Sequence, residues 1–135
     1  MITRADWLAP DEAEIDRWTA AVPTLGGRGA KYGGQLVLTS ERLVWQPLRI
    51  SAFTVAHEHV LPIEAGGEWW ELALVDVDRV ESDAKRRSLL HIVARDGART
   101  SFLVAAGRFG PVWSRKNQAA RDDAIGRITT AIGPA

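Results

Sequence analysis

Residues 33–47 constrain the fold more than any other stretch, because two alternating runs in them flank a turn sequence. Apolar side chains stand at every second position of both runs, which is the period of a strand with one buried face. These positions are Leu36, Leu38, Leu43 and Trp45. The hydroxyls of Thr39 and Ser40 can accept hydrogen bonds from amides two residues on and so stabilise a tight reversal. Pro47 has no amide proton to donate to a ladder and ends the second run, so the stretch predicts a β-hairpin.

Short strands are predicted on both sides of this hairpin. They cover residues 18–22, 69–74, 75–81, 88–95 and 99–105. The last two are joined by Asp96-Gly97, a two-residue turn sequence whose hairpin type needs positive φ at both positions. Five glycines between positions 26 and 34 predict a flexible connection rather than a phosphate loop, which needs a following helix and a Lys-Ser/Thr pair. Strands at such short spacing predict an antiparallel meander and not alternating βαβ units.

One amphipathic helix is predicted at the end of the chain, over residues 117–132, with Asn117 as its candidate N-cap. Small and apolar side chains recur there at steps of three and four. They are Ala120, Ala124, Ile125, Ile128, Ala131 and Ile132. At the other end, residues 1–17 form an extension, and a short helix is predicted over residues 11–18 because acids occupy its first turn. The run of strands followed by one helix predicts that the C-terminal helix caps the sheet.

Residues 48–68 form an inserted loop that is too apolar for a simple solvated linker. Loops this long in compact domains are usually functional or disordered, and part of this one is expected to form an additional strand or a short helix. Its candidate partner-contact residues are Phe53, Val55, Val60 and Leu61. Trp69 and Trp70 are strand neighbours, so one of them must face away from the core. We expect the inserted loop to cover it, and we count Trp69 among the partner-contact candidates.

Composition favours one small domain, which we take to span residues 1–135. The absence of cysteine excludes disulfides and thiolate chemistry. Lysine and arginine together number 17, as do aspartate and glutamate, so no overall field draws the chain to nucleic acid. The charged start is unlike a signal peptide, and no stretch approaches the roughly 18 apolar residues of a membrane span. A soluble, cytoplasmic protein is the expectation.

The order of the predicted elements, together with two segments, resembles the GRAM domain of the pleckstrin-homology-like superfamily, in its bacterial stand-alone form. Residues 34–47, GQLVLTSERLVWQP, resemble the family hairpin Gly-x-Leu-x-Leu-Thr-x-x-Arg-Leu-x-aromatic-x-Pro. Residues 70–81, WELALVDVDRVE, resemble the segment x-Leu-x-Asp-Ile-x-x-Val-Glu. The resemblance implies a mainly β fold: a strongly bent antiparallel barrel or sandwich of about seven strands, capped by one C-terminal α-helix. The insert at 48–68 and the stretch 107–116 depart from the family pattern.

The basic turn formed by Lys85, Arg86 and Arg87 is the candidate site for lipid phosphates or other anions. In the superfamily that the chain resembles, basic residues on loops at the barrel mouth often take lipid phosphates. Asp83 and Glu81 lie close in the sequence and are expected to neutralise the turn in part. The alternative interpretation is a solvated hairpin tip.

Two further side chains are expected to be structural. Arg42 belongs to the hairpin that resembles the GRAM family, and we expect it to pair with a carboxylate such as Asp76 or Glu81. His91 stands among apolar neighbours in a predicted strand, which favours a hydrogen-bonded histidine over a metal ligand. No arrangement of serine, histidine and aspartate for catalysis follows from the positions of these residues.

These observations favour a non-catalytic binding or adaptor module that engages a protein partner or a lipid surface through its loops. A protein partner is favoured because the net charge is zero, with an anionic membrane surface as the other version. A homodimer is an alternative that an exposed tryptophan and an unpaired barrel edge would allow. An intracellular carrier of an apolar ligand is the alternative, and it predicts a deep apolar pocket. A metal-dependent hydrolase using His57 and His59 is weaker, because no further ligand motif accompanies them. No metal or cofactor is therefore predicted.

Overall fold

The structure is a computed structural model, and it describes residues 6–23, 30–47, 52–56, 59–63, 68–105 and 115–133. Seven of its strands form one antiparallel sheet. They are β1 (Glu14–Pro23), β2 (Ala30–Thr39), β3 (Arg42–Pro47), β6 (Trp70–Ala73), β7 (Val77–Ser82), β8 (Leu89–Ala94) and β9 (Arg99–Ala105). A short 3₁₀ helix, η1 (Leu74–Asp76), joins β6 to β7, and one α-helix, α1 (Arg115–Ile132), ends the described chain.

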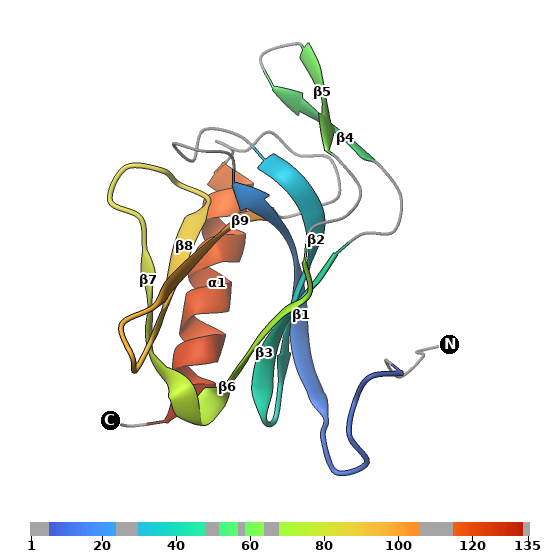
Figure 1. The fold of residues 1–135 in the computed structure, drawn as a ribbon. Helices are drawn as coiled ribbons and strands as arrows, with labels where there is room; N and C mark the ends of the chain where they lie inside the picture. Colours follow the sequence, from blue (N-terminus) through green and yellow to red (C-terminus); the bar gives the residue numbers. More distant parts are fainter. Residues whose placement is uncertain are drawn as a thin grey trace.

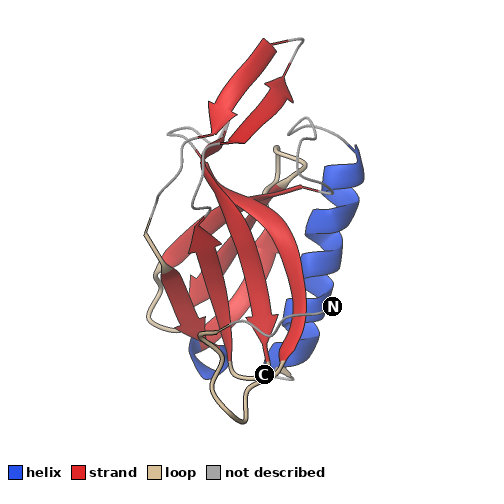
Figure 2. Ribbon diagram, turned by 90° about the vertical axis from the view of Figure 1, so that its right-hand side faces the viewer, coloured by secondary structure: helices blue, strands red, loops and turns tan. Residues whose placement is uncertain are grey.

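The sheet has the strand order β6-β3-β2-β1-β9-β8-β7 and is strongly curved (Figure 1). Figure 2 shows α1 packed along one side of this curved sheet. The predicted fold class, about seven antiparallel strands with one C-terminal helix, is therefore confirmed. Among the described residues, no helix is long and apolar enough to cross a membrane.

The core lies between the inner face of the sheet and α1. Phe102 of β9 stacks on Trp45 of β3, with ring centroids 6.0 Å apart, and meets Trp70 of β6 edge-on at 5.3 Å. From α1, Ala124 and Ile128 are fully buried in the same cluster. The apolar face that the sequence predicts for the helix is thus confirmed, because its other members pack against this cluster as well.

The β2–β3 hairpin forms as the alternation predicts. Its apolar row, Leu36, Leu38, Leu43 and Trp45, is buried in the core. In the turn, Thr39 Oγ1 accepts hydrogen bonds from the backbone amides of Glu41 (3.1 Å) and Arg42 (3.0 Å), which is the stabilisation expected from a hydroxyl at this position. Pro47 is the last residue of β3.

The short helix expected over residues 11–18 is wrong, because β1 begins at Glu14. β1 pairs with β2 along its whole length, with a bulge between Glu14 and Asp16. The residues before β1 cross the outer face of the sheet, where Ala13 and Ser40 exchange two hydrogen bonds of 2.8 and 3.0 Å. Pairing with a neighbouring strand overrides the local pattern of acids after a proline.

Part of the inserted loop forms a β-hairpin. β4 (Ala52–Ala56) and β5 (His59–Ile63) pair as a separate antiparallel hairpin, which projects beyond one end of the large sheet (Figure 2). The expectation that some of the insert forms an additional strand is therefore correct. The side chains of the four partner-contact candidates in it lie outside the described residues.

The start of α1 and the length of the β8–β9 connection differ from prediction. α1 begins at Arg115, so Asn117 is a buried residue of its first turn and not the N-cap. The connection between β8 and β9 has four residues, 95–98, where a two-residue turn was expected. Gly97 has a φ of 92° there, in the left-handed region that glycine adopts without strain.

Candidate anion-binding turn

The β7–β8 turn that contains Lys85, Arg86 and Arg87 is held by the side chain of Asp83. Asp83 Oδ2 accepts hydrogen bonds from the backbone amides of Lys85 (3.0 Å) and Arg86 (2.7 Å). This is the local side-chain to backbone bonding that favours aspartate at turns. The turn therefore has a defined backbone conformation at the position of the basic residues.

His91 of β8 contacts the carboxylate of Asp83. Its Nε2 lies 2.9 Å from Asp83 Oδ1, and its Nδ1 lies 2.6 Å from Ser101 Oγ on β9. Because an ionised carboxylate can only accept, Nε2 carries the proton of this hydrogen bond. The hydrogen bonding expected for His91 is confirmed.

Asp83, His91 and Ser101 form a hydrogen-bonded chain with the residue types of a catalytic acid–base–nucleophile triad. Their positions in the sequence did not reveal this chain. The cross-strand register, with His91 directly opposite Ser101, brings them together. Ser101 lies within the regular strand β9, whereas a catalytic serine of α/β-hydrolases stands on a sharp strand-to-helix turn. In this geometry the hydrogen-bonded chain fixes the ring of His91 and the carboxylate of Asp83.

Arg121 of α1 anchors the other side of the turn. It is only 6% exposed, and its Nη1 donates a 2.9 Å hydrogen bond to the backbone carbonyl of Arg86. Its Nε and Nη2 donate to Asp122 Oδ1 at 3.1 and 3.0 Å. The turn is therefore fixed by a carboxylate from its own chain segment and by a guanidinium from the helix, so its basic side chains project from a preorganised support.

The basic side chains of the turn differ from most described arginines by having no polar partner among the described residues. Lys85 and Arg87 are exposed and Arg86 is half-buried, and none of their three side chains makes a hydrogen bond or ion pair within the described part of the chain. The arginines that do have such partners are Arg17, Arg42, Arg79, Arg95, Arg99, Arg121 and Arg127.

Of the two carboxylates expected to neutralise the turn in part, Glu81 is paired with other arginines, whereas Asp83 lies in the turn, keeps its charge and forms no ion pair with the three basic side chains. Glu81 pairs with Arg79 at 3.2 Å and with Arg99 at 2.9 Å. Asp83 takes the two turn amides and His91. The positive charge of Lys85, Arg86 and Arg87 is therefore not cancelled by a paired carboxylate among the described residues.

The buried carboxylate of Glu12 and the half-buried carboxylate of Asp83 are expected to make the protein sensitive to acid. The hydrogen bond from Arg42 is the main cause that lowers the pKa of Glu12 from 4.5 to about 2, against the opposing effect of burial. The backbone amide of Arg86 and then His91 lower the pKa of Asp83 from 3.8 to about 2. Because both values are depressed in the folded state, the stabilisation is complete above pH 5 and is lost as the pH falls toward 2, by about 3 kcal/mol for Glu12 and about 2 kcal/mol for Asp83.

Urea unfolding at a series of pH values between 2.5 and 7 measures this effect. The variants Glu12→Gln and Asp83→Asn are each expected to show a smaller loss of unfolding free energy between pH 5 and 2.5 than the wild type. An unfolding free energy of the wild type that stays constant over this interval would contradict the prediction.

Arg42 is structural as expected, but its partners are not Asp76 or Glu81. It forms a two-bond pair with the buried carboxylate of Glu12, with Nε–Oε2 of 2.9 Å and Nη2–Oε1 of 3.0 Å. It also pairs with Glu71 through Nη1. Asp76 and Glu81 are farther from Arg42 in the sequence than Glu12 is, and Glu12 reaches Arg42 because the segment before β1, whose Trp7 carbonyl also accepts from Arg42, lies against β3.

Trp69 is 41% exposed, and Trp70 faces the core, as strand alternation requires. The described ring contact of Trp69 is with Trp7, whose centroid lies 5.4 Å away in an edge-on arrangement. Trp7 in turn lies 5.0 Å from the guanidinium carbon of Arg42. The segment before β1 therefore covers part of Trp69, and the cover expected from the inserted loop stays a prediction, because the side chains of that loop lie outside the described residues.

The structure describes little of the two histidines of the metal-hydrolase alternative. His57 lies outside the described residues, as does the side chain of His59. Within the described part of the chain, no group of three or more histidine, cysteine, aspartate or glutamate side chains could hold a metal ion. The metal-hydrolase alternative, the contact role of the insert and the homodimer stay predictions.

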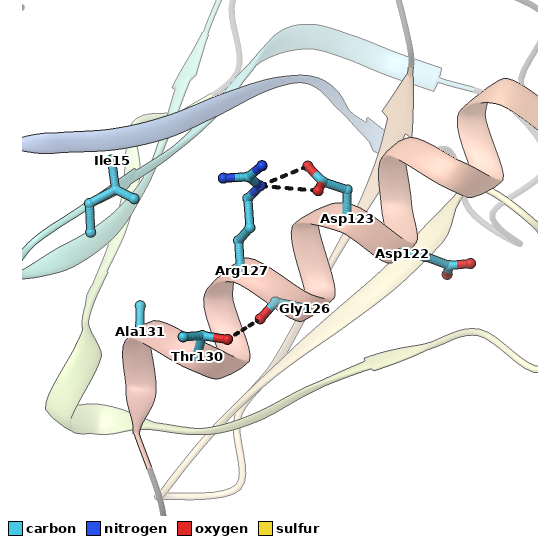
Figure 3. A pocket seen from close by; sticks show the side chains of 7 residues that line it. All are labelled: Ile15, Asp122, Asp123, Gly126, Arg127, Thr130 and Ala131. Carbon is cyan, nitrogen blue, oxygen red and sulfur yellow. Dashed lines mark hydrogen bonds and ion pairs between the residues drawn. The ribbon is translucent and has the colours of Figure 1, made fainter.

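An open groove of about 580 Å³ lies between the start of β1 and the exposed side of α1 (Figure 3). Ile15 forms its β1 wall. The α1 wall consists of Asp122, Asp123, Gly126, Arg127, Thr130 and Ala131. Because this groove is open and carries charged side chains, it is unlike the deep apolar pocket that the carrier alternative predicts, and that alternative stays a prediction.

Comparison with solved structures gives the class of fold. The crystal structure of N-terminally truncated linker-DH/PH domains of p115-RhoGEF matches with a TM-score of 0.55 at 12% identity, over 93% of this chain and 30% of that chain. The C-terminal domain of an unknown protein from Leishmania infantum gives 0.49 at 14% identity, over 90% and 84% of the two chains. The DH/PH domains of PDZ-RhoGEF in complex with GTP-gamma-S activated RhoA give 0.48 at 12% identity, over 88% and 29%.

The p115-RhoGEF likeness shows a pleckstrin-homology-like fold and, at this identity, the fold alone. This chain spans less than a third of the length of either RhoGEF chain. No family model matches the sequence, and no curated protein matches it significantly. The resemblance to the GRAM domain in particular therefore stays a prediction.

Proposed function

We propose that this protein is a non-catalytic, GRAM-like binding module that attaches to an anionic membrane surface through Lys85, Arg86 and Arg87. The observation that carries the proposal is the contrast with the seven arginines that have polar partners: the side chains of Lys85, Arg86 and Arg87 have none among the described residues. A cation that is not engaged in an ion pair stays available for an external phosphate.

The support of the turn strengthens the proposal. Asp83 and Arg121 fix the backbone of the turn before any ligand arrives, so little backbone ordering opposes binding. Neutral net charge does not argue against a local site, because screening restricts each exposed charge to a range of about 8 Å at physiological salt. Adjacent uncancelled cations on one turn can therefore attract an anionic surface while the rest of the molecule does not.

Co-sedimentation with vesicles tests the proposal. The variant Lys85/Arg87→Ala removes two exposed cations and none of the contacts that fix the turn. Its affinity for vesicles that contain phosphatidylserine is expected to fall about 30-fold, since each basic residue near such a surface contributes about 1 kcal/mol. Wild-type binding is expected to weaken with added salt and to be absent with neutral vesicles.

The matched control is Arg79/Arg99→Ala, which removes the same charge from two exposed arginines that are paired with Glu81. This control is expected to bind anionic vesicles nearly as the wild type does. Equal losses in the two variants would show that only net charge matters, and no binding by the wild type would overturn the membrane proposal.

A further inference from the structure

Trp69 and Trp7 form an aromatic pair at the surface, next to the start of β6. Their ring centroids lie 5.4 Å apart and their planes stand at 79°. An edge-on contact of this kind uses the edge of one ring and one face of the other, so Trp69 keeps at least one face that Trp7 does not cover. Because Trp69 is 41% exposed, its side chain is accessible to a partner, and tryptophan is enriched among the residues that dominate the energy of protein interfaces.

The contact between Arg42 and Trp7 indicates which kind of group suits this pair. The guanidinium carbon of Arg42 lies 5.0 Å from the centroid of the Trp7 ring, within the range of about 6 Å for a cation–π contact. Arg42 is also paired with Glu12 and Glu71, so it is fixed as part of the fold. Among the described residues, no cation lies on the ring of Trp69, which leaves this ring able to take one from outside.

The acidic neighbours of the pair favour a cationic occupant. Asp6 directly precedes Trp7, and Glu68 directly precedes Trp69. Both acids are exposed, and neither side chain forms a hydrogen bond or an ion pair with the described part of the chain. Because Arg42 is already paired with carboxylates of its own, these two charges stay available for a further cation.

The indole N–H of Trp69 is available as well. It makes no hydrogen bond with the described residues, and an indole N–H can only donate. We propose that the Trp7–Trp69 pair binds a basic segment of a protein partner, which places an arginine or lysine over the open face of Trp69 and a main-chain carbonyl at its indole N–H. The carboxylates of Asp6 and Glu68 attract the cation and disfavour an anionic lipid surface at this place. None of these residues belongs to the basic turn, so the inference does not depend on the membrane proposal.

Selection from a display library of random peptides, with the full chain as bait, supplies the probe for the test. Selected peptides are expected to contain arginine or lysine and to shift the indole N–H signals of Trp69 and Trp7 in a spectrum of the labelled protein. Replacing the arginine by citrulline, or the lysine by acetyl-lysine, keeps the shape and removes the charge, and is expected to weaken binding about tenfold or more. Acidic peptides, unshifted indole signals, full binding by the uncharged peptide or failure to select any peptide would overturn the proposal.

Variants of the protein locate the site. Trp69→Leu keeps an apolar side chain but removes the aromatic face and the N–H, and is expected to weaken the selected peptide about tenfold. The double variant Asp6→Asn/Glu68→Gln is expected to weaken it about threefold to tenfold. Its matched control, Glu41→Gln/Asp96→Asn, removes the same charge from two exposed acids in other turns and should bind as the wild type does. Equal losses in the two double variants would overturn the proposal, because only net charge would then matter.

The chain also carries a basic turn of its own, which could occupy the pair in a second copy. Lys85/Arg87→Ala should bind the selected peptide as the wild type does and leave the oligomeric state unchanged. Self-association of the wild type that rises with concentration, and that both this variant and Trp69→Leu abolish, would overturn the proposal by showing that a second copy is the occupant.

Discussion

Replacing Arg42 with leucine is expected to lower the free energy of unfolding by about 3–5 kcal/mol, because the change leaves the buried carboxylate of Glu12 without its counter-charge. The side chain of Glu12 is fully buried, and that of Arg42 is 22% exposed. The same guanidinium donates a 3.0 Å hydrogen bond to the carbonyl of Trp7, so the variant also loosens the segment before β1. Urea unfolding followed by tryptophan fluorescence measures the loss.

Two comparisons separate this effect from the loss of an arginine as such. Arg17→Leu breaks a partly exposed pair with Glu14 and is expected to cost at most about 1 kcal/mol. The double variant Glu12→Leu/Arg42→Leu removes the unpaired charge as well and should be more stable than Arg42→Leu alone. A cost for Arg42→Leu no larger than that for Arg17→Leu would show that the pair with Glu12 does not stabilise the fold.

Gly34→Ala is expected to lower the unfolding free energy by about 1–3 kcal/mol or more, because there is no space for the added methyl group. A Cβ at Gly34 would stand 2.4 Å from the carbonyl oxygen of Gln46 and 2.8 Å from two ring atoms of Trp45. The Gln46 oxygen belongs to the backbone of β3, and the Trp45 ring is buried in the core. Neither group can move away without disturbing the pairing of β2 with β3. Thermal and urea unfolding measure the change.

A matched control is available at Gly126, where the same substitution is expected to change the stability in the opposite direction. Gly126→Ala places the same methyl group on the exposed side of α1, where a Cβ meets no atom within 4 Å. Alanine is preferred over glycine inside a helix, so this variant is expected to be more stable by about 1 kcal/mol. If both variants changed stability in the same direction, the steric account of Gly34 would be incorrect.

Sequence patterns correctly predicted the buried faces of the β2–β3 hairpin and of α1, because these faces follow from the geometry of a single strand or helix. The alternation of Leu36, Leu38, Leu43 and Trp45 gave the right buried face, since strand geometry alone decides it. The steps of three and four at the end of the chain gave the buried face of α1, including Ala124 and Ile128. Turn residues marked where strands reverse, but not how many residues the β8–β9 connection contains.

The contacts that sequence reasoning missed depend on how the elements are arranged in space. Glu12 was not expected as the partner of Arg42 because the acids around it also suit the first turn of a helix. The hydrogen-bonded chain beside the basic turn depends on the register that places His91 opposite Ser101, which a one-residue slip would abolish. The one available indication was that Asp83 precedes a turn, where its side chain commonly bonds backbone amides.

The pairing of β1 with β9 has a consequence for how the protein folds. Among the described residues, it joins an early strand to a late one over three residue pairs. The other pairs of the large sheet unite strands that follow one another, apart from the insertion between β3 and β6. Sequence-local hairpins form before a contact that must close a long loop. We therefore expect the two halves of the sheet to form first and the β1–β9 pairing, which must close a long loop, to form last.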